Sequence, residues 1–193
     1  MYEGLVRQGQ TPKIMIVACC DSRVDPAILT DCDPGDLFVV RNVANLVPPC
    51  EAGGGYHGTS AALEFAVCYL KVEHVIVMGH ARCGGVRALM DNTRRDENVG
   101  QFISPWMSIA DEARRDVLAA LPMATADVQA EACERAALRV SLRNLLGFPF
   151  VKEAVADGRL DVHGWYFDIN RGELLRCDLD SPEFEVIPAR TAA

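Results

Sequence analysis

The sequence predicts an α/β fold: a mostly parallel sheet of four strands with an antiparallel C-terminal edge strand or hairpin, flanked by helices. Three observations lead to this prediction. Short β-branched runs alternate with longer helical segments, which is the order of a parallel sheet with helical crossovers. The runs are apolar throughout, as in strands that are buried on both faces. Near the C-terminus, two strand-like segments are separated by a short turn, which favours antiparallel pairing.

The three N-terminal strands are predicted from continuous apolar runs. Residues 14–18 follow Pro12, residues 37–40 form the second run, and residues 73–78 end at Gly79. Runs of this length, bounded by turn residues, are typical of buried strands.

Four segments are predicted to be helices: residues 60–71, 86–90, 105–121 and 126–146. The first is apolar on nearly every side and is therefore predicted to be buried. The two long segments are rich in Ala, Leu, Glu and Arg. One ends near Pro122, and Gly147 with Pro149 ends the other.

The C-terminal part predicts a hairpin. Residues 160–169 and 173–178 are strand-like, and residues 170–172 (NRG) form the turn between them. The sequence contains no internal repeat, low-complexity segment or linker, so residues 1–193 are predicted to form one domain.

Composition and charge narrow the function classes. Lys and Arg number 19 and Asp and Glu 27, which gives a net charge of −8, and 50% of the residues are hydrophobic. This balance argues against nucleic acid or an anionic membrane as the main partner, since both require a basic surface. Apolar runs stay far below the ~18 residues of a membrane span. Residues 1–10 lack the apolar core of a signal peptide, so a cytoplasmic location is expected.

The chain contains eight cysteines. A chain of this length and apolarity does not need disulfide staples, so free thiols and metal ligands are expected. Most of the eight are predicted to be buried thiols that pack as small apolar residues, namely Cys20, Cys32, Cys50, Cys68, Cys133 and Cys177.

Two polar clusters follow predicted strands. Residues 19–23 (CCDSR) lie at the end of the first strand, and residues 80–83 (HARC) lie at the end of a later one. Ligands of open parallel sheets bind at the carboxyl ends of the strands, so both clusters are expected to face one crevice. Cys19, His80 and Cys83 then form a Cys₂His set, which is typical of a zinc site with one open position. We therefore expect one Zn²⁺ per chain.

The role of Asp21 has two interpretations. It is either a fourth ligand that closes a structural zinc site or the acceptor of a hydrogen bond from zinc-bound hydroxide. A guanidinium fork from Arg23 would hold Asp21 ionised and away from the metal, although the same pair is also compatible with a simple turn salt bridge. Two thiolate ligands leave little positive charge on the ion, so the pKa of the bound water is expected to fall less than at an all-histidine site. Activity is therefore expected to rise toward alkaline pH.

These motifs resemble the β-class carbonic anhydrases. The resemblance rests on C-x-D-x-R (residues 19–23) and H-x-x-C-G-G (80–85), with residues 41–45 and 58–67 between them, and a weaker match lies at 163–166. It implies a zinc lyase that converts CO₂ reversibly to bicarbonate and a proton through zinc-bound hydroxide. Asp21 and Arg23 would be the catalytic pair.

The resemblance also implies a substrate cleft. In the plant-like branch of the family, a glutamine at the position of Gln10 contacts the substrate and an aromatic residue at the position of Phe38 lines the cleft. Phe65 stands where a tyrosine is frequent, and the backbone N–H of Gly84 would hold a bicarbonate oxygen. This cleft often lies at a dimer interface, so a homodimer or a multiple of dimers is expected.

Two departures refine these expectations. A second branch of the family is switched off at low pH and has a tryptophan where this chain has Ile16, so a bicarbonate switch is expected to be absent. Family members usually have helices before the first strand that embrace the partner subunit, whereas ten residues precede Thr11 here. Two rival functions remain: a hydrolase of carbonyl sulfide or carbon disulfide, and a non-catalytic zinc protein, in which a carboxylate held off the metal would serve no purpose.

Overall fold

A computed structural model describes residues 2–51, 56–91, 100–179, 181 and 183–188. Its sheet has the strand order β2-β1-β3-β4-β5-β6. The strands are β1 (Ile14–Cys19), β2 (Leu37–Asn42), β3 (His74–His80), β4 (Asp161–Asp168), β5 (Glu173–Cys177) and β6 (Phe184–Val186). β1 to β4 pair in parallel, whereas β5 and β6 pair antiparallel. The predicted fold class is therefore confirmed, with β6 as an additional edge strand.

Strand register places the two polar clusters side by side. Ala18 of β1 lies opposite Met78 of β3, so Cys19 and His80 follow this pair at the same edge of the sheet. Buried side chains alternate along β1: Met15 and Val17 enter the larger core, whereas Ile16 enters the smaller core on the other face. This alternation explains why the strands are apolar throughout.

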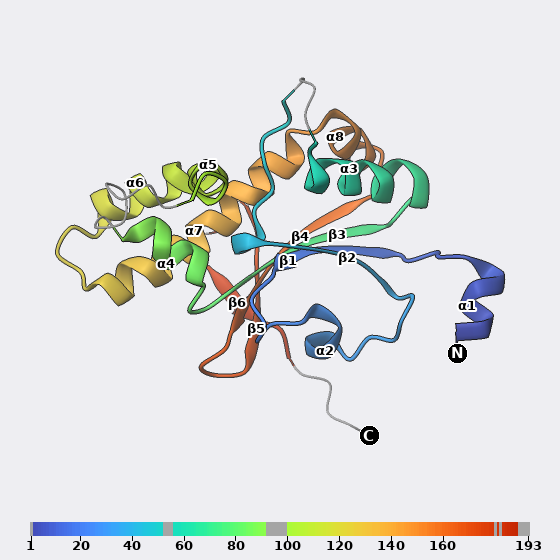
Figure 1. The fold of residues 1–193 in the computed structure, drawn as a ribbon, viewed down its shortest axis with the longest axis horizontal. Helices are drawn as coiled ribbons and strands as arrows, with labels where there is room; N and C mark the ends of the chain where they lie inside the picture. Colours follow the sequence, from blue (N-terminus) through green and yellow to red (C-terminus); the bar gives the residue numbers. More distant parts are fainter. Residues whose placement is uncertain (1, 52–55, 92–99, 180, 182, 189–193) are drawn as a thin grey trace.

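Helices cover the two faces unequally (Figure 1). The helices α3, α7 and α8 supply the larger core, and α2 lies on the other face. The bounds are α1 Tyr2–Gln8, α2 Pro26–Thr30, α3 Gly58–Glu64, α4 Gly84–Met90, α5 Ile103–Met107, α6 Asp111–Ala120, α7 Ala126–Leu146 and α8 Pro149–Ala156. Two 3₁₀ turns (Val43–Asn45 and Ser108–Ala110) and a π-helical turn (Phe65–Leu70) complete the chain's helical elements in the described residues.

Residues 60–70 of the predicted helix 60–71 are helical, but the prediction that the helix is buried was wrong. Phe65 is 42% exposed and Tyr69 is 72% exposed. Only one side of this helix faces the sheet, where Leu63, Ala66 and Val67 are buried. Its other apolar side is open in a single chain.

The predicted helix over residues 105–121 is interrupted. The Ser108 hydroxyl donates a hydrogen bond of 2.7 Å to the Pro105 carbonyl, and a 3₁₀ turn separates α5 from α6. A serine that bonds a nearby carbonyl competes with the regular helical ladder, which accounts for the break. Pro149 does not simply end α7, because it occupies the first turn of α8.

The eight cysteines lie within the described residues and are free thiols. Of the six cysteines predicted to be buried, Cys133 and Cys177 are buried and Cys32 and Cys68 are half-buried. Cys20 and Cys50 are exposed, because each lies in a loop. Within the described part of the chain, no helix is long and apolar enough to cross a membrane.

Candidate metal centre

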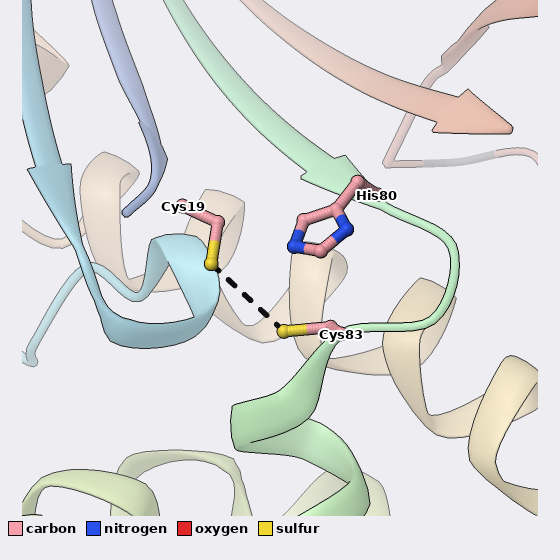
Figure 2. Close-up of side chains that lie close together, drawn as sticks. All are labelled: Cys19, His80 and Cys83. Atoms are coloured by element: carbon pink, nitrogen blue, oxygen red, sulfur yellow. Dashed lines mark hydrogen bonds between the residues drawn. The ribbon is translucent and has the colours of Figure 1, made fainter. Parts of the chain in front are cut away.

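Cys19, His80 and Cys83 converge at the carboxyl ends of β1 and β3 (Figure 2). Cys19 ends β1, His80 ends β3, and Cys83 directly precedes α4. Their sulfur and nitrogen ligand atoms lie within 4.8 Å of one another, and all three residues are buried. The predicted convergence of the two clusters is therefore present in the structure.

The geometry of the three side chains fits a metal ion. The two sulfurs are 4.0 Å apart. Two thiolates on one tetrahedral zinc ion, with Zn–S bonds of about 2.3 Å, lie about 3.8 Å apart. The Nδ1 atom of His80 is 2.8 Å from the Ala81 carbonyl, and with Nδ1 as the donor the Nε2 atom carries a lone pair. This Nε2 atom is buried without a hydrogen-bond partner among the described residues, which is the position that a metal would satisfy.

Electrostatics favour thiolate at this centre. A hydrogen bond from Cys83 lowers the pKa of Cys19 to about 4 against the opposing effect of burial, with help from His80. The same hydrogen bond and burial raise the pKa of Cys83. Burial acts to lower the pKa of His80, but the nearby sulfur of Cys19 and its charge raise this pKa overall. The hydrogen bond between the two sulfurs therefore favours the loss of one proton from the pair.

Arg23 donates hydrogen bonds to Asp21 from both its side chain and its backbone. Oδ1 of Asp21 accepts bonds from the Arg23 backbone N–H (3.0 Å) and Nε (2.9 Å), and Oδ2 accepts one from Nη2 (2.7 Å). These side-chain bonds hold the pKa of Asp21 well below its usual range. Nη2 of Arg23 also donates to the Arg82 carbonyl at 3.1 Å, which links the loop after β1 to the loop after β3.

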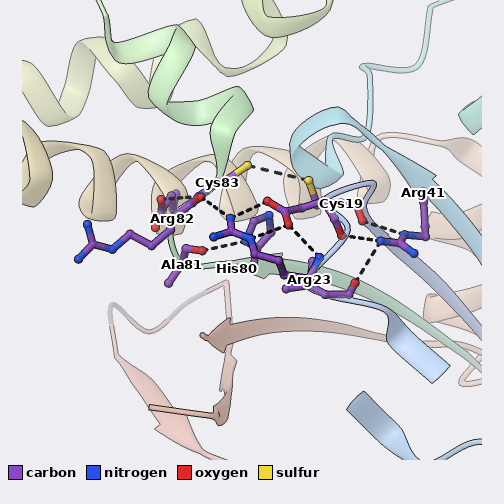
Figure 3. Close-up of polar contacts among 10 residues, drawn as sticks. Cys19, Arg23, Arg41, His80, Ala81, Arg82 and Cys83 are labelled. Carbon is purple, nitrogen blue, oxygen red and sulfur yellow. Dashed lines mark hydrogen bonds and ion pairs between the residues drawn. The ribbon is translucent and has the colours of Figure 1, made fainter. Parts of the chain in front are cut away.

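Arg41 of β2 fixes the backbone of the same loop (Figure 3). It donates to the carbonyls of Cys19 (2.9 Å) and Asp21 (2.7 Å) and to Oδ2 of Asp25 (2.8 Å). Asp25 in turn caps α2 by accepting from the Ala27 backbone N–H. Sequence reasoning gave Arg41 no role, although its register beside Ala18 on β1 places it next to Cys19.

Glu134 of α7 is a second residue that sequence reasoning missed. It is only 6% exposed, yet its Oε1 accepts from the Cys83 backbone N–H at 2.9 Å and its Oε2 accepts from the Tyr166 hydroxyl at 2.8 Å. Burial raises the pKa of this carboxyl. The signal for Glu134 in the sequence was an acidic residue on the otherwise apolar side of a long predicted helix.

Comparison with known proteins identifies the family. A family model described as carbonic anhydrase matches residues 14–174. The chain belongs to the β-carbonic anhydrases. It is 44% identical over 168 residues to β-carbonic anhydrase 5 of the chloroplast of Arabidopsis thaliana, which covers 86% of this chain. The chain spans about half (54%) of that relative's length.

Solved structures agree with this assignment. The β-carbonic anhydrase CcaA superposes with a TM-score of 0.89 at 33% identity, over 98% of this chain and 83% of that one. A β-carbonic anhydrase of Sordaria macrospora, described as tetrameric, superposes with a TM-score of 0.80 at 28% identity, over 91% and 85% of the two chains.

In this β-carbonic anhydrase chain, α4 packs tightly behind the cluster. A Cβ atom on Gly85 would lie 2.8 Å from Cγ1 of Val43 and 3.2 Å from Cβ of Ala44. Glycine at position 85 therefore lets α4 pack closely against Val43 and Ala44, and this packing fixes the position of Cys83. A Cβ on Gly84 would meet nothing within 4 Å, so the backbone beside the cluster is open, as the predicted substrate contact requires.

The other predicted substrate residues do not join the cluster within one chain. Gln10 is exposed and precedes β1, at the opposite end of that strand from Cys19. Phe38 pairs with Met15, about 13 Å along β1 from Cys19. The ring of Phe65 lies beside that of Phe38, with centroids 6.0 Å apart and planes tilted by 35°. A role of these three residues in the same site requires a second copy of the chain.

Proposed function

We propose that this β-carbonic anhydrase hydrates CO₂ reversibly to bicarbonate and a proton at a zinc ion bound by Cys19, His80 and Cys83. One observation carries the proposal: a carboxylate, Asp21, is held by Arg23 beside a buried Cys₂His cluster. Three protein ligands would leave the fourth position of the zinc ion for solvent, and the hydrogen bonds from Arg23 would keep the carboxylate of Asp21 away from that position.

Zinc in such a site lowers the pKa of water and so supplies a nucleophile near neutral to alkaline pH. Asp21 then acts only as an acceptor, because Arg23 keeps it ionised. Two of the three bonds from Arg23 occupy Oδ1, so Oδ2 retains a lone pair that would accept a hydrogen bond from the attacking water. That bond orients the oxygen lone pair toward CO₂, and the proton released in hydration leaves to solvent.

The proposed enzyme is a homodimer or a multiple of dimers. Phe65 and Tyr69 are stacked, with centroids 5.6 Å apart, and both are exposed. An apolar patch of this kind supports an interface that would bring Gln10, Phe38 and Phe65 of one chain to the cluster of another. The substitution Phe65→Asp should shift the sedimentation coefficient toward the monomer. Met123→Asp, at a residue 94% exposed elsewhere, should not.

Stopped-flow CO₂ hydration with a pH indicator tests the reaction, on zinc-quantified protein in alkaline buffer. Wild type should hydrate CO₂ in proportion to its zinc content, Cys83→Ser should lose zinc and activity, and Asp21→Asn should retain zinc and lose most activity. Cys50→Ser, at an exposed cysteine outside the cluster, is the matched control.

Two outcomes would overturn the proposal. Hydrolysis of carbonyl sulfide or carbon disulfide without CO₂ hydration would indicate the related hydrolase activity. One zinc ion per chain with neither activity would indicate a non-catalytic zinc protein.

A further inference from the structure

A second group of metal-ligating side chains lies at the opposite end of the sheet. His74 is the first residue of β3, Asp161 is the first residue of β4, and His163 lies two residues further along β4. His74 and Asp161 are register partners, and residues two apart on a strand share a face, so all three side chains lie on one face. His74 is six residues, or about 20 Å, from His80 along β3.

The ligand atoms are already at metal-binding separations. Nε2 of His163 is 3.2 Å from Nδ1 of His74, and Nδ1 of His74 is 3.6 Å from Oδ2 of Asp161. Two imidazole nitrogens on a tetrahedral ion, with bonds of about 2.05 Å, lie about 3.3 Å apart. The two nitrogens are therefore close enough for one ion once the rings turn out of their mutual hydrogen bond, so that both lone pairs face it. Asp161, whose side chain is 73% exposed, is free to rotate toward the ion.

The backbone under these side chains is fixed by the sheet. The Glu73 N–H donates to the Lys13 carbonyl at 2.8 Å, and the Asp161 N–H donates to the Glu73 carbonyl at 2.9 Å. The first residues of β3 and β4 are thus tied to each other and to the chain before β1. Donors held on strands lose little freedom when they bind an ion.

The protonation and charge of the group also suit a cation. Burial and the neighbouring His74 lower the pKa of His163, whereas Asp161 and Asp178 oppose them only in part. The side chains of His74 and Asp161 are 39% and 73% exposed, which gives an ion access from solvent.

We propose that His74, Asp161 and His163 form a second cation site, separate from the Cys₂His centre, for a divalent first-row transition ion such as Zn²⁺. Imidazole donors select zinc, nickel or copper over magnesium and calcium, which prefer oxygen ligands. Three protein ligands at a half-exposed position leave the remaining coordination to solvent. The bound ion would link the start of β3 to the start of β4.

Zinc stoichiometry of the full chain tests the proposal. The protein is equilibrated with excess Zn²⁺, passed through a desalting column, and analysed for metal per chain, and Zn²⁺ binding is followed by calorimetry. Wild type should hold two zinc ions, and His74→Gln and His163→Gln should hold one, with a second calorimetric phase that is weaker by roughly a hundredfold. His57→Gln is the matched control, because it removes an exposed histidine outside the group.

The controls separate this site from the Cys₂His centre. Circular dichroism and CO₂ hydration should be unchanged in the His74 and His163 variants, since these residues lie far from the proposed reaction. In a Cys83→Ser background, the remaining zinc should still be lost on His163→Gln. If either histidine variant does not fold, Asp161→Asn at the exposed position should still weaken the second phase. One zinc ion in wild type, or two in both histidine variants, would show that the rings form only a hydrogen-bonded pair.

Discussion

Replacing Glu134 with alanine should damage both the stability of the fold and its hold on zinc. The side chain is buried and accepts two hydrogen bonds, one from the Cys83 backbone and one from the Tyr166 hydroxyl. Alanine has no acceptor, and the position is only 6% exposed in wild type. The Cys83 N–H and the Tyr166 hydroxyl would both lose their partner.

The size of the effect follows from these two donors. Each buried donor left unpaired costs about 1–3 kcal/mol, so Glu134→Ala should lower the free energy of unfolding by roughly 2–6 kcal/mol. This is a large part of the about 5–15 kcal/mol typical of a domain. For a chain of this length, the melting temperature should fall by roughly 2–4 °C per kcal/mol. Glu134→Gln retains an oxygen for the Cys83 N–H and removes the cost of burying a charge, so it should stay within about 1 kcal/mol of wild type.

Two measurements separate a positioning role from a purely structural one. Urea denaturation of zinc-free protein gives the loss of stability, and competition with a chelator gives the zinc affinity of the folded protein. Because Glu134 fixes the backbone of a proposed ligand, the alanine variant should bind zinc roughly 10–100-fold more weakly. Glu134→Gln should restore most of this affinity.

An unfolding free energy of Glu134→Ala within about 0.5 kcal/mol of wild type, the range of neutral surface changes, would show that the two donors lose nothing with the carboxylate. Unchanged zinc affinity together with a large loss of stability would show that the carboxylate supports the fold but not the site. Tyr166→Phe removes one of the two donors and should cost about 1 kcal/mol, with zinc affinity near that of wild type.

Two further predictions concern protonation. In zinc-stripped protein near pH 6, iodoacetamide should modify Cys19 before Cys133, because the hydrogen bond from Cys83 lowers the pKa of Cys19 whereas burial raises that of Cys133. Zinc should protect Cys19, and equal labelling of the two cysteines by peptide mass spectrometry would contradict this prediction. The lowered pKa of His163 means that the unfolded chain binds its proton more readily, so stability falls as the pH drops below the usual value of 6.5. In the presence of chelator, His163→Gln should therefore lose less stability than wild type between about pH 7 and pH 5, and equal losses in urea titrations would refute the argument.

Strand positions and the Cys₂His cluster could be predicted because their signals are local. Apolar runs mark the strands, and parallel pairing brings strand ends together whatever the chain between them. Residues such as Arg41 and Glu134 have no local signal, since their partners lie 22 and 51 residues away along the chain. Only the register of β2 and the rotation of α7 place these side chains against the site.

Short elements escaped prediction for a different reason. α2 has five residues and β6 has three, too few to show a hydrophobic period. For α2 a signal did exist, because Asp25 followed by Pro26 is a typical N-cap and first-turn pair. The end of the sheet at β6 is set by its pairing with β5, which no local pattern encodes.

The error over residues 60–71 has the most bearing on function. Apolarity on every side of a helix indicates that the helix is covered, but it does not say whether the cover belongs to the same chain. Here one side meets the sheet and the other, with Phe65 and Tyr69, is open. Because the proposed metal ligands lie in one chain and the proposed apolar wall requires two, zinc binding and CO₂ hydration should be separable. A variant that disrupts the interface, such as Phe65→Asp, should keep its zinc, but its rate of CO₂ hydration should fall.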